Sequence, residues 1–301
     1  MKIKANGIEI EVEDTGAVPG ENRPVVLLIM GLGMQLVAWP PAMVRSLVDA
    51  GYRVIRHDNR DIGLSQYFDH LGPPNLVWTM IKYKLRASIR PPYSLSDMAS
   101  DAVGVLDALG VAKAHVVGVS MGGMIAQRMA IAAPHRLRSL TSIMSSSGAR
   151  GLPEATPKVR RVLLSRPASE SPEDILAHYM HLYKTIGSPG YPIPEREMKT
   201  RIQASLKRSF HPQGTMRQMV SIVADTHLRA QALSAVRVPT LVLHGRADPL
   251  VPYPCGEDTA RRIAGAELVG IDGMGHDLAP GVVERLMPPL QAFLTARDNA
   301  T

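Results

Sequence analysis

The chain has 301 residues, and 45% of them are hydrophobic, which is enough for a large buried core. The formal net charge is +7 at pH 7, but the basic residues are scattered along the chain. No dense basic run is interleaved with aromatic residues, so the composition argues against a nucleic-acid partner. The length suits one α/β domain with an insertion, or two small domains.

Cys255 is the only cysteine, so neither an intrachain disulfide nor a thiolate metal cluster can form. Residues 1–7 include lysines but no apolar stretch of the kind that a signal peptide needs. No run approaches the roughly 20 apolar residues that span a bilayer. We therefore expect a cytoplasmic protein without stable membrane insertion. Its oligomeric state stays open, with a homodimer as one option.

The first half of the chain alternates between strand and helix patterns. Residues 1–14 alternate between apolar and polar side chains, which predicts a half-buried antiparallel strand or hairpin. Further strands are expected at 25–30, 52–56, 114–119 and 137–144. Helices are expected at 40–50, at 96–110 with Ser96 as the N-cap, and directly after Ser120.

The strand rhythm stops between residues 148 and 235. This stretch has many prolines, and its patterns predict helices over 171–186, 194–208 and 213–230. Strands are expected again at 239–245 and 267–271, before a last helix over 281–296. Strands that alternate with helices predict an α/β fold with a mostly parallel sheet covered on both faces. We therefore expect residues 1–147 and 236–301 to form an α/β core, and residues 148–235 to form a helical cap over the active site.

Residues 66–95 form a second irregular stretch, which contains a basic amphipathic segment at 76–89. Three interpretations of this segment are open. It is a second piece of a lid, a surface helix that contacts lipid-like substrates or membranes, or a helix packed on its own domain. The pattern alone favours the third interpretation.

Gly118-Val119-Ser120-Met121-Gly122 reads G-x-S-x-G, the sequence of a nucleophile elbow. An apolar, β-branched segment precedes it and a helix pattern follows it, which is the context that an elbow needs. The sharp turn exposes the Ser120 hydroxyl at the sheet edge. Gly118 and Gly122 keep Cβ atoms out of the crowded space between strand and helix. The motif in this context predicts a nucleophilic serine at Ser120.

A serine nucleophile needs a base within hydrogen-bond reach and an acid that orients the base. An elbow implies the chain order serine, acid, histidine. Asp248 and His276 follow later predicted strands, at the sheet edge where Ser120 emerges. We predict Ser120 as the nucleophile, His276 as the general base and then acid, and Asp248 as the orienting acid.

Each of these assignments has an alternative. Asp248 is also a plausible turn residue before Pro249, and Asp272 or Asp277 would be the acid in that case. Both of these lie beside His276 in the sequence, where a carboxylate rarely points at the neighbouring imidazole. The other histidines near predicted strands, His57, His115 and His244, are assigned structural roles.

The oxyanion formed by nucleophilic attack needs preorganised backbone donors. We expect one to be the amide of Met121, the first residue of the helix after the elbow, where the helix dipole assists. The second is expected in the glycine-containing turn at 30–34, and Leu32 is the predicted donor. A plain strand-to-helix turn is the alternative interpretation of that segment.

These residues together resemble the α/β-hydrolase superfamily, and within it a carboxylesterase branch of the aclacinomycin methylesterase type. The resemblance rests on the turn at 30–33, the segments 54–65 and 114–122, Asp248 and His276. It implies an eight-stranded, mostly parallel sheet with a helical cap, and neither cofactor nor metal. Met30 departs from the pattern, because many relatives carry histidine there. A serine nucleophile argues against the dehalogenase and epoxide hydrolase relatives, which use aspartate.

We therefore expect a serine hydrolase that cleaves a small-molecule carboxylic ester through an acyl-enzyme. The same triad also serves methylesterases or lactonases of biosynthetic pathways, C–C bond hydrolases and perhydrolases, because a fold does not fix its substrate. A catalytically silent ligand receptor is disfavoured, since such a protein has less need for a complete triad. Acyl chain length and alcohol preference are not readable from the sequence.

Overall fold

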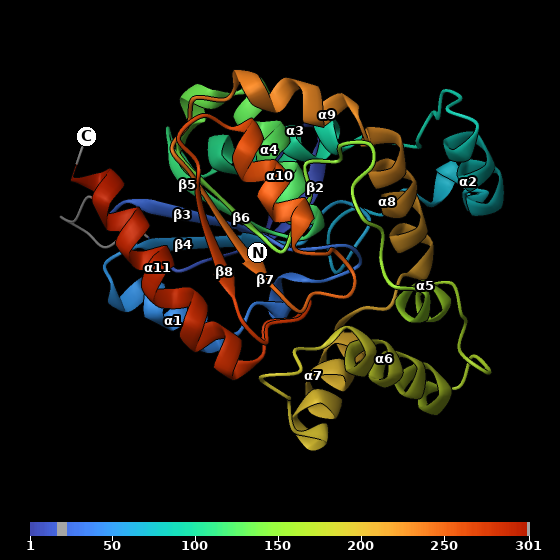
Figure 1. Cartoon of the computed structure of the whole chain (residues 1–301). Helices are drawn as coiled ribbons and strands as arrows, with labels where there is room; N and C mark the ends of the chain where they lie inside the picture. The colour runs from blue at the N-terminus through green and yellow to red at the C-terminus, as the bar shows by residue number, and fades with distance from the viewer. Residues whose placement is uncertain (17–22, 300–301) are drawn as a thin grey trace.

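An eight-stranded sheet forms the centre of the protein (Figure 1). The computed structural model describes residues 1–16 and 23–299. The strands are β1 (Lys2–Ala5), β2 (Ile8–Asp14), β3 (Val25–Ile29), β4 (Arg53–His57), β5 (Ala114–Val119), β6 (Leu137–Ile143), β7 (Thr240–Gly245) and β8 (Glu267–Ile271). They lie in the order β1-β2-β4-β3-β5-β6-β7-β8, and only the pairs β1–β2 and β2–β4 are antiparallel. The predicted α/β fold with an eight-stranded, mostly parallel sheet is confirmed.

Eleven α-helices connect these strands in the described part of the chain. They are α1 (Pro41–Asp49), α2 (Leu76–Lys84), α3 (Leu95–Ala108), α4 (Met121–Ala132), α5 (Pro157–Leu163), α6 (Pro172–Ile186), α7 (Glu195–Arg208), α8 (Pro212–Asp225), α9 (Leu228–Ala232), α10 (Pro254–Arg262) and α11 (Pro280–Asp298). None of the helices described is both long and apolar enough to cross a bilayer.

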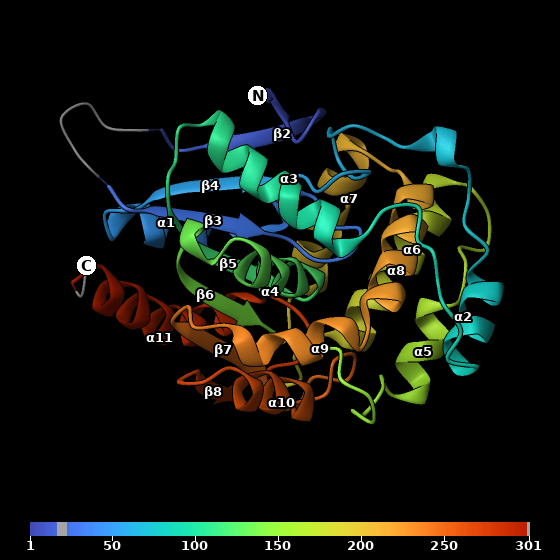
Figure 2. The ribbon, with the colours of Figure 1, turned by 90° about the horizontal axis from the view of Figure 1, so that it is seen from above.

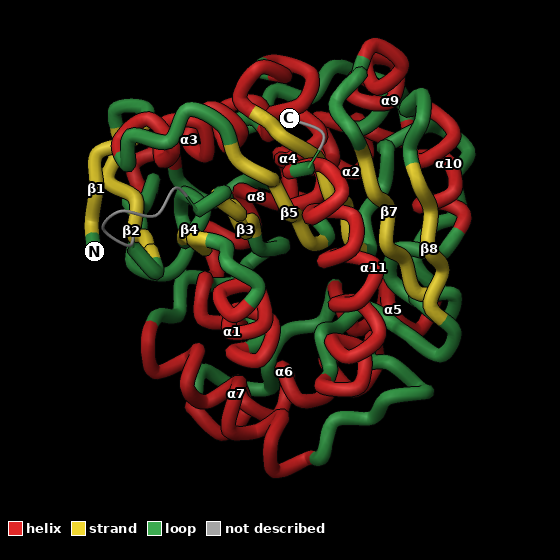
Figure 3. The backbone as a smooth tube through the Cα atoms, turned by 90° about the vertical axis from the view of Figure 1, so that its left-hand side faces the viewer, coloured by secondary structure: helices red, strands yellow, loops and turns green. Residues whose placement is uncertain are grey.

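Helices cover the sheet on both faces, with α3 and α4 on one side and α1 and α11 on the other (Figures 2 and 3). The central strand β3 is buried along its whole length, so it presents apolar side chains to both layers. Leu27 and Ile29 pack with α3 and α4, whereas Val26 and Leu28 pack with α1 and α11. This alternation follows from the two-residue period of a strand.

Helix α3 begins two residues earlier than expected. Ser94, not Ser96, is its N-cap, because the Ser94 hydroxyl accepts a hydrogen bond from the Asp97 amide at 3.1 Å. The Asp97 carboxylate in turn accepts the Ser94 amide at 2.7 Å, which completes a capping box. The expected N-cap, Ser96, therefore lies in the first turn of the helix. Gly110, the glycine predicted to end this helix, follows it with a left-handed φ of 66°.

The segment between β6 and β7 is helical, as the sequence predicts. Figures 1 and 2 show α5, α6, α7 and α8 gathered on one side of the molecule, while α9 lies against α4. The single helix expected over 213–230 is wrong, because His227 has a left-handed backbone with φ of 78° and separates α8 from α9. Beyond this break the Arg229 side chain is fully buried, and its Nε donates to Gln127 Oε1 on α4 at 2.8 Å.

Candidate active site

Ser120 lies at the turn between β5 and α4 in a strained backbone conformation, with φ of 56° and ψ of −119°. The tight turn depends on its two glycines. A Cβ at Gly118 would lie 2.2 Å from the Gly122 carbonyl oxygen, and one at Gly122 would lie 2.0 Å from the Ile29 carbonyl oxygen. A real Cβ atom cannot lie this close to a carbonyl oxygen. Strands β3 and β5 and helix α4 therefore approach this closely only with glycine at these two positions.

The Ser120 backbone is also fixed from the neighbouring strand. Its amide donates to the Ile143 carbonyl at 2.9 Å, and its carbonyl accepts the Ser145 hydroxyl at 2.7 Å. Sequence patterns do not single out Ser145, because a serine after a strand is common. The two contacts hold the elbow to the end of β6, which limits the positions open to the Ser120 side chain.

The structure brings the predicted nucleophile, base and acid into one hydrogen-bonded chain. His276 Nε2 lies 3.0 Å from Ser120 Oγ, and His276 Nδ1 lies 2.7 Å from Asp248 Oδ2. A carboxylate only accepts, so Nδ1 carries the proton of the neutral ring and Nε2 is free to accept the serine proton. His276 and Asp248 are both buried, which strengthens their interaction relative to one in water.

Asp248 is held by its own turn as well as by the histidine. Its Oδ1 accepts the amides of Leu250 and Val251 at 2.9 and 2.8 Å, and Oδ2 is left for His276. Asp248 therefore fits both interpretations of its sequence position, because it shapes the turn that follows β7 and its side chain also reaches the imidazole. Two fixed amide donors orient the carboxylate before any substrate is present.

The alternative acids lie elsewhere. The Asp277 carboxylate accepts the hydroxyl and the amide of Ser188 at 2.5 and 3.1 Å. Asp272 is exposed and lies 3.1 Å from Arg246. Neither carboxylate has a hydrogen bond with His276 among the described residues, so Asp248 is the acid that the geometry favours.

Other candidate bases and nucleophiles have different partners. His244 Nε2 donates to the Val251 carbonyl at 2.7 Å, and the ring of His115 lies between Ser139 and Asp298. Burial lowers the pKa of both imidazoles below 6.5. Burial also raises the pKa of Cys255 to about 11, so this thiol stays protonated at neutral pH and is a poor nucleophile.

The predicted oxyanion turn faces Ser120. A Cβ at Gly31 would lie 3.2 Å from Ser120 Cβ, so the backbone of the turn runs directly beside the nucleophile. The Leu32 amide has no acceptor within the described ranges, and Met121 is the first residue of α4, where an amide lacks an intrahelical acceptor. Both amides are therefore available to an oxyanion. Asn59 supports the turn, because its side-chain amide donates to the Met30 carbonyl at 2.9 Å.

The helices between β6 and β7 hold two of the loops around Ser120. Gln218 on α8 accepts the Gly33 amide at 3.0 Å and donates to the Arg60 carbonyl at 2.9 Å. The His276 amide donates to the Ile186 carbonyl, at the end of α6, at 2.7 Å. Sequence patterns did not mark Gln218 or Ile186, because both contacts join residues that are far apart in the chain.

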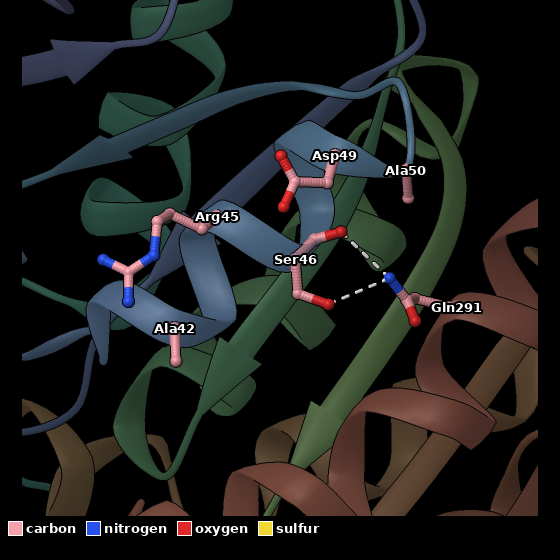
Figure 4. A pocket seen from close by; sticks show the side chains of 6 residues that line it. All are labelled: Ala42, Arg45, Ser46, Asp49, Ala50 and Gln291. Carbon is pink, nitrogen blue, oxygen red and sulfur yellow. Dashed lines mark hydrogen bonds between the residues drawn. The ribbon is translucent and has the colours of Figure 1, made fainter.

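Two other features resemble ligand sites but have polar groups engaged within the protein. Asp61, Asp69 and His211 place ligand atoms within 4.8 Å of one another, but the Arg217 guanidinium donates to both carboxylates and supplies the cation itself. A surface hollow between α1 and α11 is lined by Ala42, Arg45, Ser46, Asp49, Ala50 and Gln291 (Figure 4). Its polar groups are engaged in part, since Gln291 donates to the carbonyl and hydroxyl of Ser46, and it contains none of the predicted site residues.

Comparison with known proteins identifies the family. A family model of the α/β hydrolase fold matches residues 24–279. This chain belongs to the α/β-hydrolase family. It is 30% identical to the rhodomycin D methylesterase DnrP of Streptomyces peucetius over 295 residues, which cover 91% of both chains. It is also 30% identical to the rhodomycin D methylesterase DauP of Streptomyces sp. strain C5 over 297 residues, which again cover 91% of both chains.

A solved hydrolase structure has the same fold over nearly its whole length. The meta-cleavage product hydrolase CumD of Pseudomonas fluorescens IP01 superposes with a TM-score of 0.72 at 20% identity, covering 98% of this chain and 97% of that one. At this identity the match bears on the fold alone. The predicted resemblance to the α/β-hydrolase superfamily and to its methylesterases is confirmed.

Proposed function

We propose that this α/β-hydrolase cleaves carboxylic esters through an acyl-enzyme on Ser120. The observation that carries the proposal is the chain Ser120–His276–Asp248, with distances of 3.0 Å and 2.7 Å between the joined atoms. A serine hydroxyl is a weak nucleophile unless a base removes its proton, and this arrangement supplies the base in an orientation fixed by the acid. The methylesterase relatives support an ester as the substrate class.

The first half of the reaction transfers the acyl group to the enzyme. As Ser120 Oγ attacks the ester carbonyl carbon, its proton passes to His276 Nε2, and the carbonyl electron pair moves onto oxygen. The amides of Leu32 and Met121 donate to the resulting oxyanion. When the carbonyl re-forms, the bond to the alcohol oxygen breaks, and the His276 proton passes to the departing alcohol.

The second half releases the acid. Water takes the place of the alcohol, gives a proton to His276 and attacks the acyl-serine. The second tetrahedral intermediate collapses, the proton returns to Ser120 Oγ, and the carboxylic acid leaves. Throughout, Asp248 stabilises the imidazolium and accepts the hydrogen bond from Nδ1. Every step uses side chains and amides that lie around Ser120.

Replacement of the nucleophile tests this proposal. Ser120→Ala is expected to lower kcat for short p-nitrophenyl esters by a factor on the order of 10⁴ or more. A fluorophosphonate probe should add its phosphonyl group to the native chain at Ser120, read by intact mass and peptide mapping. Ser100→Ala, an exposed serine on α3, is the matched control and should behave as the native chain. Ester hydrolysis that persists in Ser120→Ala would refute the mechanism.

Methyl esters are the narrower substrate class to test first, because two relatives of 30% identity are named methylesterases. A series of methyl, ethyl and butyl esters of one aromatic acid should show kcat/KM falling as the alcohol grows. A lactone and a vinylogous diketone in the same assay separate ester hydrolysis from lactone opening and C–C cleavage. Faster turnover of either of these would replace the ester assignment while leaving the role of Ser120 intact.

A further inference from the structure

Helix α2 turns its apolar side toward solvent. It lies at the edge of the molecule beside α8 (Figures 1 and 2). Exposed fractions of 73% at Val77, 53% at Trp78 and 73% at Leu85 are unusual for such side chains. We define the α2 patch as the exposed apolar residues of this helix and its C-cap: Val77, Trp78, Met80, Ile81 and Leu85.

The patch forms one continuous face. Val77, Ile81 and Leu85 are spaced by four residues, so they lie in a line along the helix, and Trp78 and Met80 flank that line. In a helix that packs on its own protein the apolar line faces the core. Here the helix packs on its own protein, as the sequence favoured, but its apolar line faces solvent.

The opposite face of α2 makes the contacts with the protein. The Tyr83 ring stacks on His227, with centroids 6.2 Å apart, and Thr79 is the buried residue of the helix. Asn75 caps the helix by accepting the Trp78 amide at 2.8 Å. The helix is thus capped at its start and packed on its other side. Its apolar face is therefore presented outward by a formed helix.

The sequence around the patch contains cations but no acidic residues. Residues 70–96 contain no aspartate or glutamate, but they include Lys82, Lys84, Arg86 and Arg90. None of these four makes an ion pair within residues 1–16 and 23–299. By helical spacing, Lys82 lies on the Trp78 side of the apolar line and Lys84 on the Met80 side. Lys82 Nζ lies 5.7 Å from the Trp78 ring centroid.

We propose that α2 docks this protein on the surface of an anionic phospholipid bilayer. The apolar line enters the interface, Trp78 sits at the depth of the headgroups, and the flanking cations contact lipid phosphates. Nine helical residues span only about 14 Å, so the helix lies in the interface and does not cross the bilayer. The charge pattern favours lipid over a second copy of the chain, since a symmetric α2–α2 contact would bring like charges together.

Vesicle binding tests this proposal without any assay of activity. Flotation of the full chain should be efficient with vesicles that contain phosphatidylglycerol and weak with phosphatidylcholine alone, and added salt should reduce it. In a Trp39→Phe background, Trp78 is the only remaining tryptophan, and its emission should shift to the blue on binding. Each of Lys82→Gln and Lys84→Gln should lower the partition coefficient about fivefold.

The apolar face is tested with a matched control. Val77→Ser/Ile81→Ser/Leu85→Ser should lower the partition coefficient by at least an order of magnitude, since three side chains no longer enter the interface. Leu164→Ser, a residue 73% exposed outside the patch, should bind as the native chain does. Equal binding to both kinds of vesicle, no binding to either, or a chain dimer that the triple variant dissociates would each overturn the proposal.

Discussion

The side-chain oxygen of Gln218 accepts the amide of Gly33 at 3.0 Å, although the two residues are 185 positions apart. Gly33 directly follows Leu32, the predicted oxyanion donor. The neighbouring Thr215 lies over Gly33 so closely that a Cβ there would be 2.9 Å from the threonine hydroxyl. Helix α8, in the segment between β6 and β7, therefore holds the turn in place and takes part in shaping the candidate site.

Removal of this contact should impair turnover more than substrate binding. Gln218→Met keeps the volume but loses the acceptor, so the turn is free to shift. Because a displacement of about 1 Å at a catalytic group costs up to about a hundredfold in rate, we expect kcat to fall ten- to a hundredfold with little change in KM. Steady-state kinetics on a short ester, with phosphonylation rates of Ser120, measure the effect.

Ser221→Ala on the same helix is the control for this prediction. Ser221 is also fully buried, and its hydroxyl donates to the Tyr93 carbonyl at 2.5 Å, away from the oxyanion turn. It should lower the free energy of unfolding by about 1–3 kcal/mol while kcat is retained. If Ser221→Ala reduced kcat as much as Gln218→Met, the effect would be one of general helix packing.

A second prediction distinguishes the three carboxylates near the histidine. Asp248→Asn should lower kcat by about 10⁴, because the amide no longer selects the productive tautomer of His276. Asp272→Asn, at an exposed position, should leave kcat unchanged. Asp277→Asn should have an intermediate effect, since Asp277 ties the loop of His276 to Ser188. An active Asp248→Asn variant together with an inactive Asp277→Asn variant would transfer the role of acid to Asp277.

Patterns of local sequence predicted the elements that position the candidate site. The parallel strands place their carboxyl ends at one edge, so residues after β5, β7 and β8 meet there although they are far apart in sequence. Ser120, Asp248 and His276 were identified by this logic, and the structure joins them by hydrogen bonds. The glycine frame of the elbow was equally readable, since only glycine fits the approach of β5 to α4.

Contacts between distant segments were not readable in the same way. Gln218 fits an amphipathic helix as well as any polar residue does, and nothing in its neighbourhood indicates Gly33 as its partner. No glycine or proline marks the break at His227. The chain is fixed there by contacts with α4, since Arg229 donates to Gln127 and Asp225 accepts from Arg128. Likewise, the pattern of α2 shows which residues share a face but not which side of the helix the protein covers.

The third prediction concerns a buried ion pair between helix α8 and the loop that follows β4. Arg217 on α8 donates to both oxygens of Asp61, at 2.6 and 2.8 Å, and both side chains are fully buried. Arg217→Met leaves the Asp61 carboxylate buried without its cation, so the free energy of unfolding should fall by about 3–5 kcal/mol. Urea denaturation measures this loss.

Two variants test whether the stranded charge is the cause. Asp61→Asn in the Arg217→Met background removes that charge, and we expect it to restore part of the lost stability. Arg201→Met breaks an exposed pair with Glu197 on α7 and should change stability by less than about 1 kcal/mol. If Arg201→Met lost as much stability as Arg217→Met, burial of the ion pair would not explain the loss of stability in Arg217→Met.

The last prediction follows from His57, which is fully buried at the end of β4. Burial lowers its pKa from 6.5 to about 4. Between these two values the unfolded chain takes up a proton at His57 and the folded chain does not. Protonation therefore favours unfolding, and the stability present above pH 6.5 is lost as the pH falls toward 4. The linkage amounts to about 2 kcal/mol between pH 7.5 and pH 5.

Replacement of His57 by an apolar side chain of similar size should remove this part of the pH dependence. We expect the difference in unfolding free energy between pH 7.5 and pH 5 to shrink by about 2 kcal/mol in His57→Met. Some dependence should persist, because burial also lowers the pKa of His115 and His244. His135→Met, at an exposed position, should keep the native slope. An unchanged slope in His57→Met would mean that the folded protein accommodates a proton at His57 as readily as the unfolded chain does.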